Sequence, residues 1–417
     1  MDDQPVGRRV ALLRAQRRMS QQVFADRLGK SKSWVDKVER GVRRLDKFST
    51  IAEIANVLNV DVSVLMDGST GSSQRGRGTR TTPGIDVSEI RAALERYDKI
   101  STPLMSPSTP IPLSELRKAV DHAWMAFQHA NYVALAKMLP KLIRDAQTAA
   151  ASGDEGEAAR TGAYLLAEVY QIASSTLRKL GEHDLAWLAA DRATMVCQRA
   201  GDELLTALAT GQVAAALAAL GRVRPALEIS MTVANQVAPE DHHNASPERL
   251  SVYGMVLLRG ALAAARLGDG YTVRELLAAA EAVAKEVGDE NFYWTCFGPT
   301  NVALFQVAAE VELGEAARAL RTSDGIDPEG YAAMLPERRA SHMLNVARAY
   351  SQVGDLQRAA ESLVEADRLA PNEVRCRPVA QELVVDLMRR TGTPPVPGLM
   401  EIADQIGLSA TAGASRS

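Results

Sequence analysis

A short segment near the start of the chain carries side chains suited to hydrogen bonding with nucleic-acid bases. When its apolar residues are placed on one side of a helix, the residues left facing outward are Lys32, Ser33, Trp34, Asp36 and Lys37. A lysine can donate to O6 and N7 of guanine, and a serine hydroxyl can pair with several bases. Trp34 can pack on a thymine methyl group or, as an equal alternative, against another helix or a partner subunit. The segment therefore predicts a surface that recognises nucleic acid.

Two short helices joined by a tight turn would position these side chains. Ser20 and Ser31 are good N-caps, because a serine oxygen can accept a hydrogen bond from a free N–H of the first helical turn. Ala25 is small enough for two helices to cross closely, and Gly29 can take the positive φ of the turn. Each helix has an apolar face, made by Val23, Phe24 and Leu28 in the first and by Val35 and Val38 in the second.

The spacing of the whole unit is more specific than that of two amphipathic helices in general, which is the simpler alternative. Ala25 lies four residues before Gly29, and Glu39-Arg40-Gly41 closes the unit. Residues 6–66 resemble the Cro/phage-repressor (XRE) helix-turn-helix family. The resemblance implies a small five-helix, lambda-repressor-like DNA-binding head over residues 1–66, with the second helix of the motif in the major groove. Lys30 departs from the family, because many members have an apolar residue there.

The resemblance also implies which residues contact double-stranded DNA. The first exposed residues of the second helix would read bases, Gln21 would reach a phosphate or an adjacent base, and the following loop would contact the DNA backbone. Glu39 and Arg14 are expected to form a structural ion pair inside the head. The predicted DNA-binding residues are Gln21, Gln22, Lys32, Ser33, Trp34, Lys37, Arg43, Arg44 and Lys47.

Charge is unevenly distributed along the chain. Residues 1–66 contain 13 Lys or Arg and 8 Asp or Glu, a net charge of +5, whereas the 417-residue chain has a net charge of −3. A basic head on an acidic remainder is typical of a small nucleic-acid-binding module joined to another domain. Because the positive excess is small, one subunit should bind DNA weakly. We therefore expect a homodimer that places two recognition helices about one turn of DNA apart.

The sequence contains none of the common signatures of an enzyme or a metal site. There is no glycine-rich phosphate loop, no GxSxG and no HExxH, and His242-His243 has no partner at ligand spacing. Cys197, Cys296 and Cys376 are far apart and form no CxxC pair. We expect no enzymatic activity, no cofactor and no metal. Reduced thiols, an acidic N-terminus and the lack of a membrane-spanning run predict a cytoplasmic protein, nucleoid-associated when bound to DNA.

Composition divides the rest of the chain into a linker and a long helical region. Residues 67–84 are rich in Gly, Ser and Thr, a short helix is expected at about 86–100, and residues 101–112 are rich in Ser, Thr and Pro. We therefore predict a flexible linker over 67–112, a helical domain over 113–408 and a disordered tail over 409–417. No alternating strand pattern is found, so the predicted fold is all-α.

The helical region contains an internal repeat. Gly181, Gly221, Gly268, Gly314 and Gly354 each follow one apolar helix and precede another, at spacings of 40, 47, 46 and 40 residues. The region resembles tetratricopeptide repeats, although their usual period is about 34 residues. A generic helical bundle with alanine-rich packing is the alternative. The resemblance implies a stacked solenoid whose concave surface suits a ligand or a partner helix.

A candidate effector site lies within the repeats. Residues 291–301 concentrate aromatic side chains in a chain that has only 5% of them, and Gly298-Pro299 breaks the helix there. A pocket is one interpretation, and aromatic filling of the core around the helix break is the other. The predicted effector-binding residues are Tyr293, Trp294, Asn301, Arg338 and Asn345.

Two functions fit these features. The order of head, linker and repeat body, together with residues 297–304, 336–340 and 346–350, resembles a large set of actinobacterial regulators. By architecture alone it also resembles the peptide-sensing regulators of Gram-positive bacteria. This implies a sequence-specific transcriptional regulator whose body mediates dimerisation or senses a peptide or small molecule. The alternative is a protein-interaction adaptor whose head tethers it only weakly to DNA.

Overall fold

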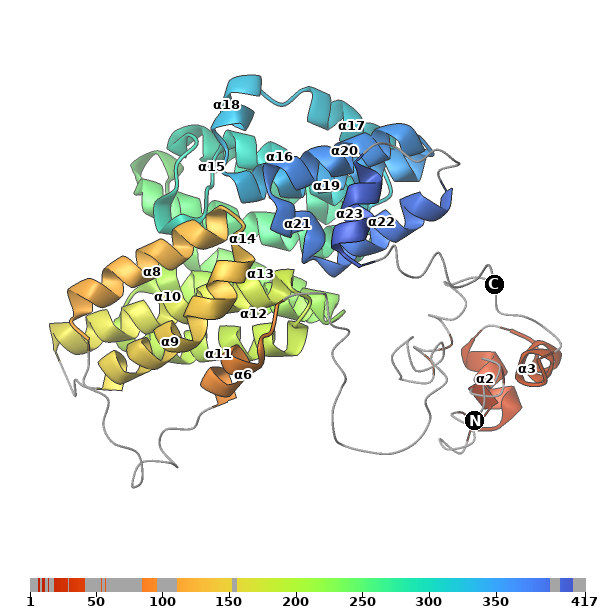
Figure 1. The fold of residues 1–417 in the computed structure, drawn as a ribbon, viewed down its shortest axis with the longest axis horizontal. Coiled ribbons are helices and arrows are strands. Elements are labelled where there is room, and N and C mark those ends of the chain that lie inside the picture. The colour runs from red at the N-terminus through yellow and green to blue at the C-terminus, as the bar shows by residue number, and fades with distance from the viewer. Residues whose placement is uncertain are drawn as a thin grey trace. The chain divides into compact units, whose positions relative to one another are not determined.

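The computed structural model describes residues 19–28, 30–41, 85–95, 111–151, 156–390 and 398–407, together with positions 7, 10, 11, 14, 54 and 57. The chain divides into two separately packed units, Met1–Arg80 and Thr81–Ser417. Every regular element in the described ranges is a helix, as the all-α prediction expected (Figure 1). Most of the predicted linker and the predicted tail lie outside the described residues.

The first unit contains the two predicted helices of the motif, α2 (Gln21–Arg27) and α3 (Lys32–Glu39). Both predicted caps are present, because Ser20 Oγ accepts from Val23 N at 3.2 Å and Ser31 Oγ accepts from Trp34 N at 3.1 Å. Both helices pack on a small core whose buried members are Val10, Phe24, Ala25, Val35 and Ile54. The three other expected helices of the head fall on residues of which single positions alone are described.

Val23 was expected on the apolar face of α2, and this expectation is wrong. Its side chain is 44% exposed, whereas Phe24 is buried. Adjacent helical residues point about 100° apart, so Phe24 and Leu28 can share the inward face while Val23 points away from it.

The second unit, the helical body, is a succession of helices joined by short turns. Its α-helices are α6 (Ser88–Glu95), α8 (Leu113–Gln128), α9 (Tyr132–Ala151), α10 (Glu157–Lys179), α11 (His183–Ala200), α12 (Glu203–Ala219), α13 (Val223–Val237), α14 (Pro247–Arg266), α15 (Gly270–Val287), α16 (Pro299–Glu312), α17 (Ala316–Asp324), α18 (Pro328–Ala333), α19 (Pro336–Val353), α20 (Leu356–Leu369), α21 (Pro371–Arg375), α22 (Pro378–Arg390) and α23 (Leu399–Gln405). Two short 3₁₀ turns, η1 (His242–Asn244) and η2 (Phe292–Trp294), lie between them.

The five repeat glycines lie in the turns of helical hairpins. Their φ angles are +82° for Gly181, +78° for Gly221, +76° for Gly268, +78° for Gly314 and +85° for Gly354. They join α10 to α11, α12 to α13, α14 to α15, α16 to α17 and α19 to α20. A side chain is unfavourable at such φ values, which explains why glycine recurs at this point of each hairpin.

The short helix that we placed in the linker packs as part of the body. Ile90, Ala93 and Leu94 of α6 are buried in the same apolar cluster as α8 to α11. The side chain of Gln147 in α9 donates to the carbonyl oxygen of Ala93 at 3.4 Å. The packed body thus begins before residue 113, because the apolar face of α6 is covered by α9.

The body curls until helices near its end contact its first hairpin (Figure 1). Asn372 Nδ2 donates to the carbonyl oxygen of Ala130 at 3.0 Å, and the hydroxyl of Tyr132 donates to Glu373 of α21. Helix α19 also contacts α8. Because these helices contact the first hairpin, the concave surface expected of a solenoid is enclosed and lines a cavity.

Gly254 marks a close approach inside this curl. Phe297 is fully buried, and a methyl group on Gly254 would overlap its ring. We expect Gly254→Ala to lower the free energy of unfolding by about 1–3 kcal/mol through overpacking, measured by chemical denaturation of the full chain. Gly260 of the same helix is the matched control, because an added Cβ would approach no atom closer than 3.2 Å. Equal stabilities of the two variants would contradict this packing.

Candidate nucleic-acid interface and cavity of the helical body

The exposed side of α3 carries the side chains predicted to read bases. Lys32, Ser33 and Lys37 are exposed, whereas Val35 and Val38 on the opposite side are buried. Within the described residues neither lysine has an ion-pair partner, so both ammonium groups can donate to an external ligand.

Two other predicted contact residues are held against the protein. Trp34 is half-buried and packs against the core of the first unit, which is the alternative that we gave for it. Gln21 Nε2 donates to Glu39 Oε2 at 2.8 Å, and Gln22 is exposed. Arg43, Arg44 and Lys47 lie outside the described residues.

Glu39 anchors the end of α3, as predicted. Its carboxylate is buried and accepts from Arg14 Nε at 2.6 Å and from Arg14 Nη2 at 2.9 Å. The hydrogen bond with Glu39 raises the pKa of Arg14, and burial of the guanidinium opposes this. A Cβ on Gly7 would overlap the Val38 carbonyl, so the chain there lies close against α3. The C-terminal end of α3 is thereby fixed while its first turn stays exposed.

Comparison with known protein families identifies the type of domain that contains α2 and α3. Residues 5–65 match the family model of a helix-turn-helix domain. This is a DNA-binding domain, and it includes α2, α3 and the ion pair between Arg14 and Glu39 of α3. No curated protein and no solved structure matches the chain.

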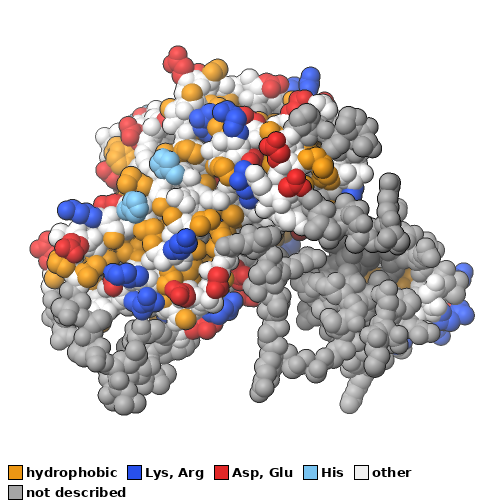
Figure 2. Space-filling view, in the orientation of Figure 1, with side chains coloured by type: hydrophobic (Ala, Val, Ile, Leu, Met, Phe, Trp, Pro, Cys, Tyr) orange, Lys and Arg blue, Asp and Glu red, His pale blue; other side chains and the backbone are white. Residues whose placement is uncertain are grey.

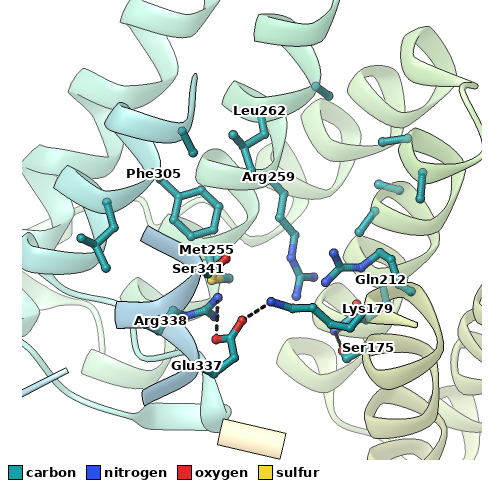
Figure 3. Close-up of a pocket in the computed structure, with 18 of the residues that line it drawn as sticks. Ser175, Lys179, Gln212, Met255, Arg259, Leu262, Phe305, Glu337, Arg338 and Ser341 are labelled. Atoms are coloured by element: carbon teal, nitrogen blue, oxygen red, sulfur yellow. Dashed lines mark hydrogen bonds and ion pairs between the residues drawn. The ribbon is translucent and has the colours of Figure 1, made fainter. Parts of the chain in front are cut away.

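A cavity of about 450 Å³ lies inside the curl of the body (Figure 3). Side chains from α10, α12, α14, α16 and α19 line it. The five residues predicted for an effector site all line this one cavity, namely Tyr293, Trp294, Asn301, Arg338 and Asn345. Sequence reasoning missed Arg178 and Lys179 at the end of α10 and Arg259 in α14, because the two helices are far apart in the chain and these residues form no motif.

The aromatic segment around η2 closes part of the cavity with an unusual backbone. Tyr293, Trp294 and Cys296 have φ angles of +50°, +59° and +51°. Such conformations persist where the surroundings fix them. Here the Tyr293 hydroxyl donates to Asp202 Oδ2 at 2.9 Å, and Trp294 stacks on Trp124 with ring centroids 5.9 Å apart. The aromatic residues both fill the core and line the cavity, so the two interpretations of this segment are compatible.

A buried ionic network lies beside the cavity and joins distant helices. Lys179 of α10 forms ion pairs with Glu337 of α19 and Glu373 of α21, and the second pair has an Nζ–Oε1 distance of 2.8 Å. Arg377 also pairs with Glu373, and Arg338 Nη1 lies 3.4 Å from Glu337 Oε2. Burial alone would raise the pKa of Glu337, but Lys179 and Arg338 outweigh it and lower the pKa to about 2. The Glu337 carboxylate is therefore ionised at neutral pH.

In the described ranges, no helix has both the length and the apolar character needed to cross a bilayer. No group of three or more His, Cys, Asp or Glu side chains in those ranges is arranged to hold a metal ion. The three cysteines are buried thiols, and burial raises the pKa of Cys197 to about 12 and of Cys296 and Cys376 to about 11 each.

Lys179→Met should destabilise the body strongly. The substitution leaves two buried carboxylates without the lysine that they share, and loss of one partner of a buried ion pair costs about 3–5 kcal/mol. Chemical denaturation of the full chain measures this loss. The matched control is Lys285→Met, because Lys285 forms an exposed pair with Glu281 at 3.1 Å and should contribute little.

The same network makes stability sensitive to acid. The pKa of Glu337 falls from an ordinary 4.5 to about 2 on folding, so its contribution is present above pH 4.5 and is lost as the pH falls toward 2. Thermal unfolding between pH 2 and pH 7 should show this loss in the wild type and a smaller loss in Lys179→Met. An identical acid dependence in both proteins would contradict the assignment.

Proposed function

We propose that this chain is a sequence-specific DNA-binding transcriptional regulator whose helical body mediates dimerisation, effector sensing or both. The observation that carries the proposal is the helix-turn-helix match at residues 5–65, together with the exposed Lys32, Ser33 and Lys37 on α3. The spacing of the motif favours the Cro/phage-repressor (XRE) type. On this proposal, the protein is located in the cytoplasm and associates with the nucleoid when it binds DNA.

The geometry of α3 supports its role as the reading helix. Lys32 and Ser33 in its first turn are exposed, and the N-terminal residues of a recognition helix are the ones that reach base edges. Ser33 and Lys37 are four residues apart and so lie on one face, whereas Lys32 is also exposed but points about 100° away from Ser33. Trp34 packs against the core of the first unit, and Glu39 near the other end of the helix binds Arg14. These contacts fix the position of α3, which carries the exposed side chains.

The helical body supports the regulatory part of the proposal. Hairpins joined at left-handed glycines and stacked in sequence favour a tetratricopeptide-like repeat, and the cavity inside the curl is suited to an effector. Figure 2 shows side chains of both charge signs mixed over the visible face of the body, with hydrophobic side chains between them. A face of this kind is not a basic surface for DNA, which favours α3 as the contact. The small positive charge of the head favours a homodimer.

The experiment that tests the proposal is a selection of genomic DNA fragments by the purified full-length protein at near-physiological salt, read by sequencing. We expect enrichment of a short inverted repeat, whose half-site spacing reports the dimer geometry. Salt-sensitive binding without enrichment, together with a protein that co-purifies after residues 1–84 are deleted, would favour the adaptor function instead.

Lys32→Ala combined with Lys37→Ala should abolish specific binding. A good side-chain contact to a base contributes about 1–3 kcal/mol of discrimination, so losing two should weaken binding to the selected site by at least about thirtyfold. Fluorescence anisotropy with the selected DNA measures this, and thermal unfolding should be unchanged because both side chains are exposed.

Lys118→Ala combined with Lys137→Ala is the matched control, since it removes the same charge from exposed positions of the body. The control should bind the selected site almost as tightly as the wild type. If both double variants bind like the wild type, α3 is not the reading helix.

A further inference from the structure

Positive charge exceeds negative charge around the cavity of the helical body. Seven arginine and lysine side chains line the cavity, against two glutamates. Glu337 is engaged by Lys179 and Arg338, and Glu312 pairs with Arg348 at 3.0 Å. Even when Glu373 behind the lining is included, the cations outnumber the carboxylates by four.

Two of these arginines form no ion pair with a carboxylate among the described residues. Arg259 Nη1 of α14 donates to the carbonyl oxygen of Leu208 at 3.4 Å, and no acidic group in the described residues lies within ion-pairing distance of it. Arg178 of α10 likewise has no ion pair there, and its buried Nε has no hydrogen-bond partner. Burial lowers the pKa of Arg259 to about 9 and of Arg178 to about 10, and neighbouring arginines add to both effects. Both guanidinium groups are still charged at neutral pH.

Several residues of the cavity lining carry buried polar atoms without a hydrogen-bond partner among the described residues. Asn301 of α16 is fully buried, and within the described residues neither its Oδ1 nor its Nδ2 has a hydrogen-bond partner. Gln212 Oε1 and His342 Nδ1 are in the same state. Burial lowers the pKa of His342 to about 4, so this ring is neutral. A buried polar atom without a partner is unfavourable, so a ligand with matching polar groups would be favoured beside it.

The other wall of the cavity is apolar. Figure 3 shows Leu262 and Phe305 on one side, whereas the charged ends of Arg259, Lys179 and Arg338 converge on the other. The Arg338 guanidinium carbon lies 5.9 Å from the centroid of the Phe305 ring, where the two walls meet. The cavity therefore has a cationic end and an apolar side.

We propose that this cavity binds a small organic anion, with a phosphate or carboxylate group held by Arg178, Arg259 and Arg338 and an apolar part against Leu262 and Phe305. The inference rests on the proposed effector sensing and names the chemical class of the effector. Guanidinium groups bind such oxyanions through paired N–H donors. A volume of about 450 Å³ is within the range of small-molecule sites.

The test uses four probes and isothermal titration calorimetry on the full-length protein. 1-Naphthyl phosphate and 1-naphthoate carry the two candidate head groups on one apolar part, 1-naphthylmethanol is the neutral analogue, and inorganic phosphate lacks the apolar part. We expect at least one naphthyl anion to bind at least tenfold more tightly than both the neutral analogue and inorganic phosphate. The stronger of the two anions identifies the head group.

Arg259→Met should weaken binding of that anion at least tenfold and leave the neutral analogue unaffected. Arg274→Met is the matched control, because Arg274 is exposed on α15. The variant should fold, since Arg259 has no ion pair to lose among the described residues and an unpaired buried charge is itself unfavourable. If its melting temperature nevertheless falls, Arg178→Met provides the same comparison from α10.

Three results would overturn the inference: no binding of either naphthyl anion at millimolar concentration, equal affinity for the neutral analogue, or anion affinity unchanged in both arginine variants. The DNA selection is run on the same preparation. A protein that selects a DNA site but binds no anion refutes the ligand class and leaves the regulator function in place. A protein that binds the anion but selects no DNA keeps the cavity site and refutes the proposed function.

Discussion

The ionic contact of Lys179 with Glu337 and Glu373 is the constraint on which the body depends. All three side chains are buried, and they come from the middle and the last thirds of the chain. A buried charge is tolerated when it is paired and hydrogen-bonded, so α10 must meet α19 and α21 for any of the three side chains to be satisfied. The arginines around them, Arg338 and Arg377, then complete the pairing of the two carboxylates.

The same closure produces the cavity and its unusual chemistry. Helices that approach from several sides bring arginines into one space, and the carboxylates of the network neutralise only part of that charge. The aromatic segment around η2 is fixed in left-handed conformations by Asp202 and Trp124, so the cavity wall is rigid there. The arginine-lined cavity depends on closure of the curl, because an open solenoid would leave these arginines exposed to water.

Local patterns in the sequence predicted the local structure well. The caps at Ser20 and Ser31 and the glycine turns depend on residues that are neighbours in the chain, and such positions can be recognised from residue type alone. Val23 was misplaced because two apolar faces are compatible with so short a helix. The docking of α6, the closure of the curl and the meeting of Arg178 with Arg259 depend on contacts between distant segments. These two arginines are 81 residues apart and belong to no motif, so only the fold reveals that they share a site.

The contact between Tyr132 and Glu373 joins residues 241 positions apart. It therefore limits whether a helical hairpin can be added to or removed from the body. In an open repeat array each unit touches only its neighbours, so units can be gained or lost with little effect on the rest. Here an extra or missing hairpin would move α21 away from Tyr132 and leave buried charges unmatched at both ends. The contact therefore requires a fixed number of hairpins. We also expect the body to unfold in one cooperative transition and not progressively from one end.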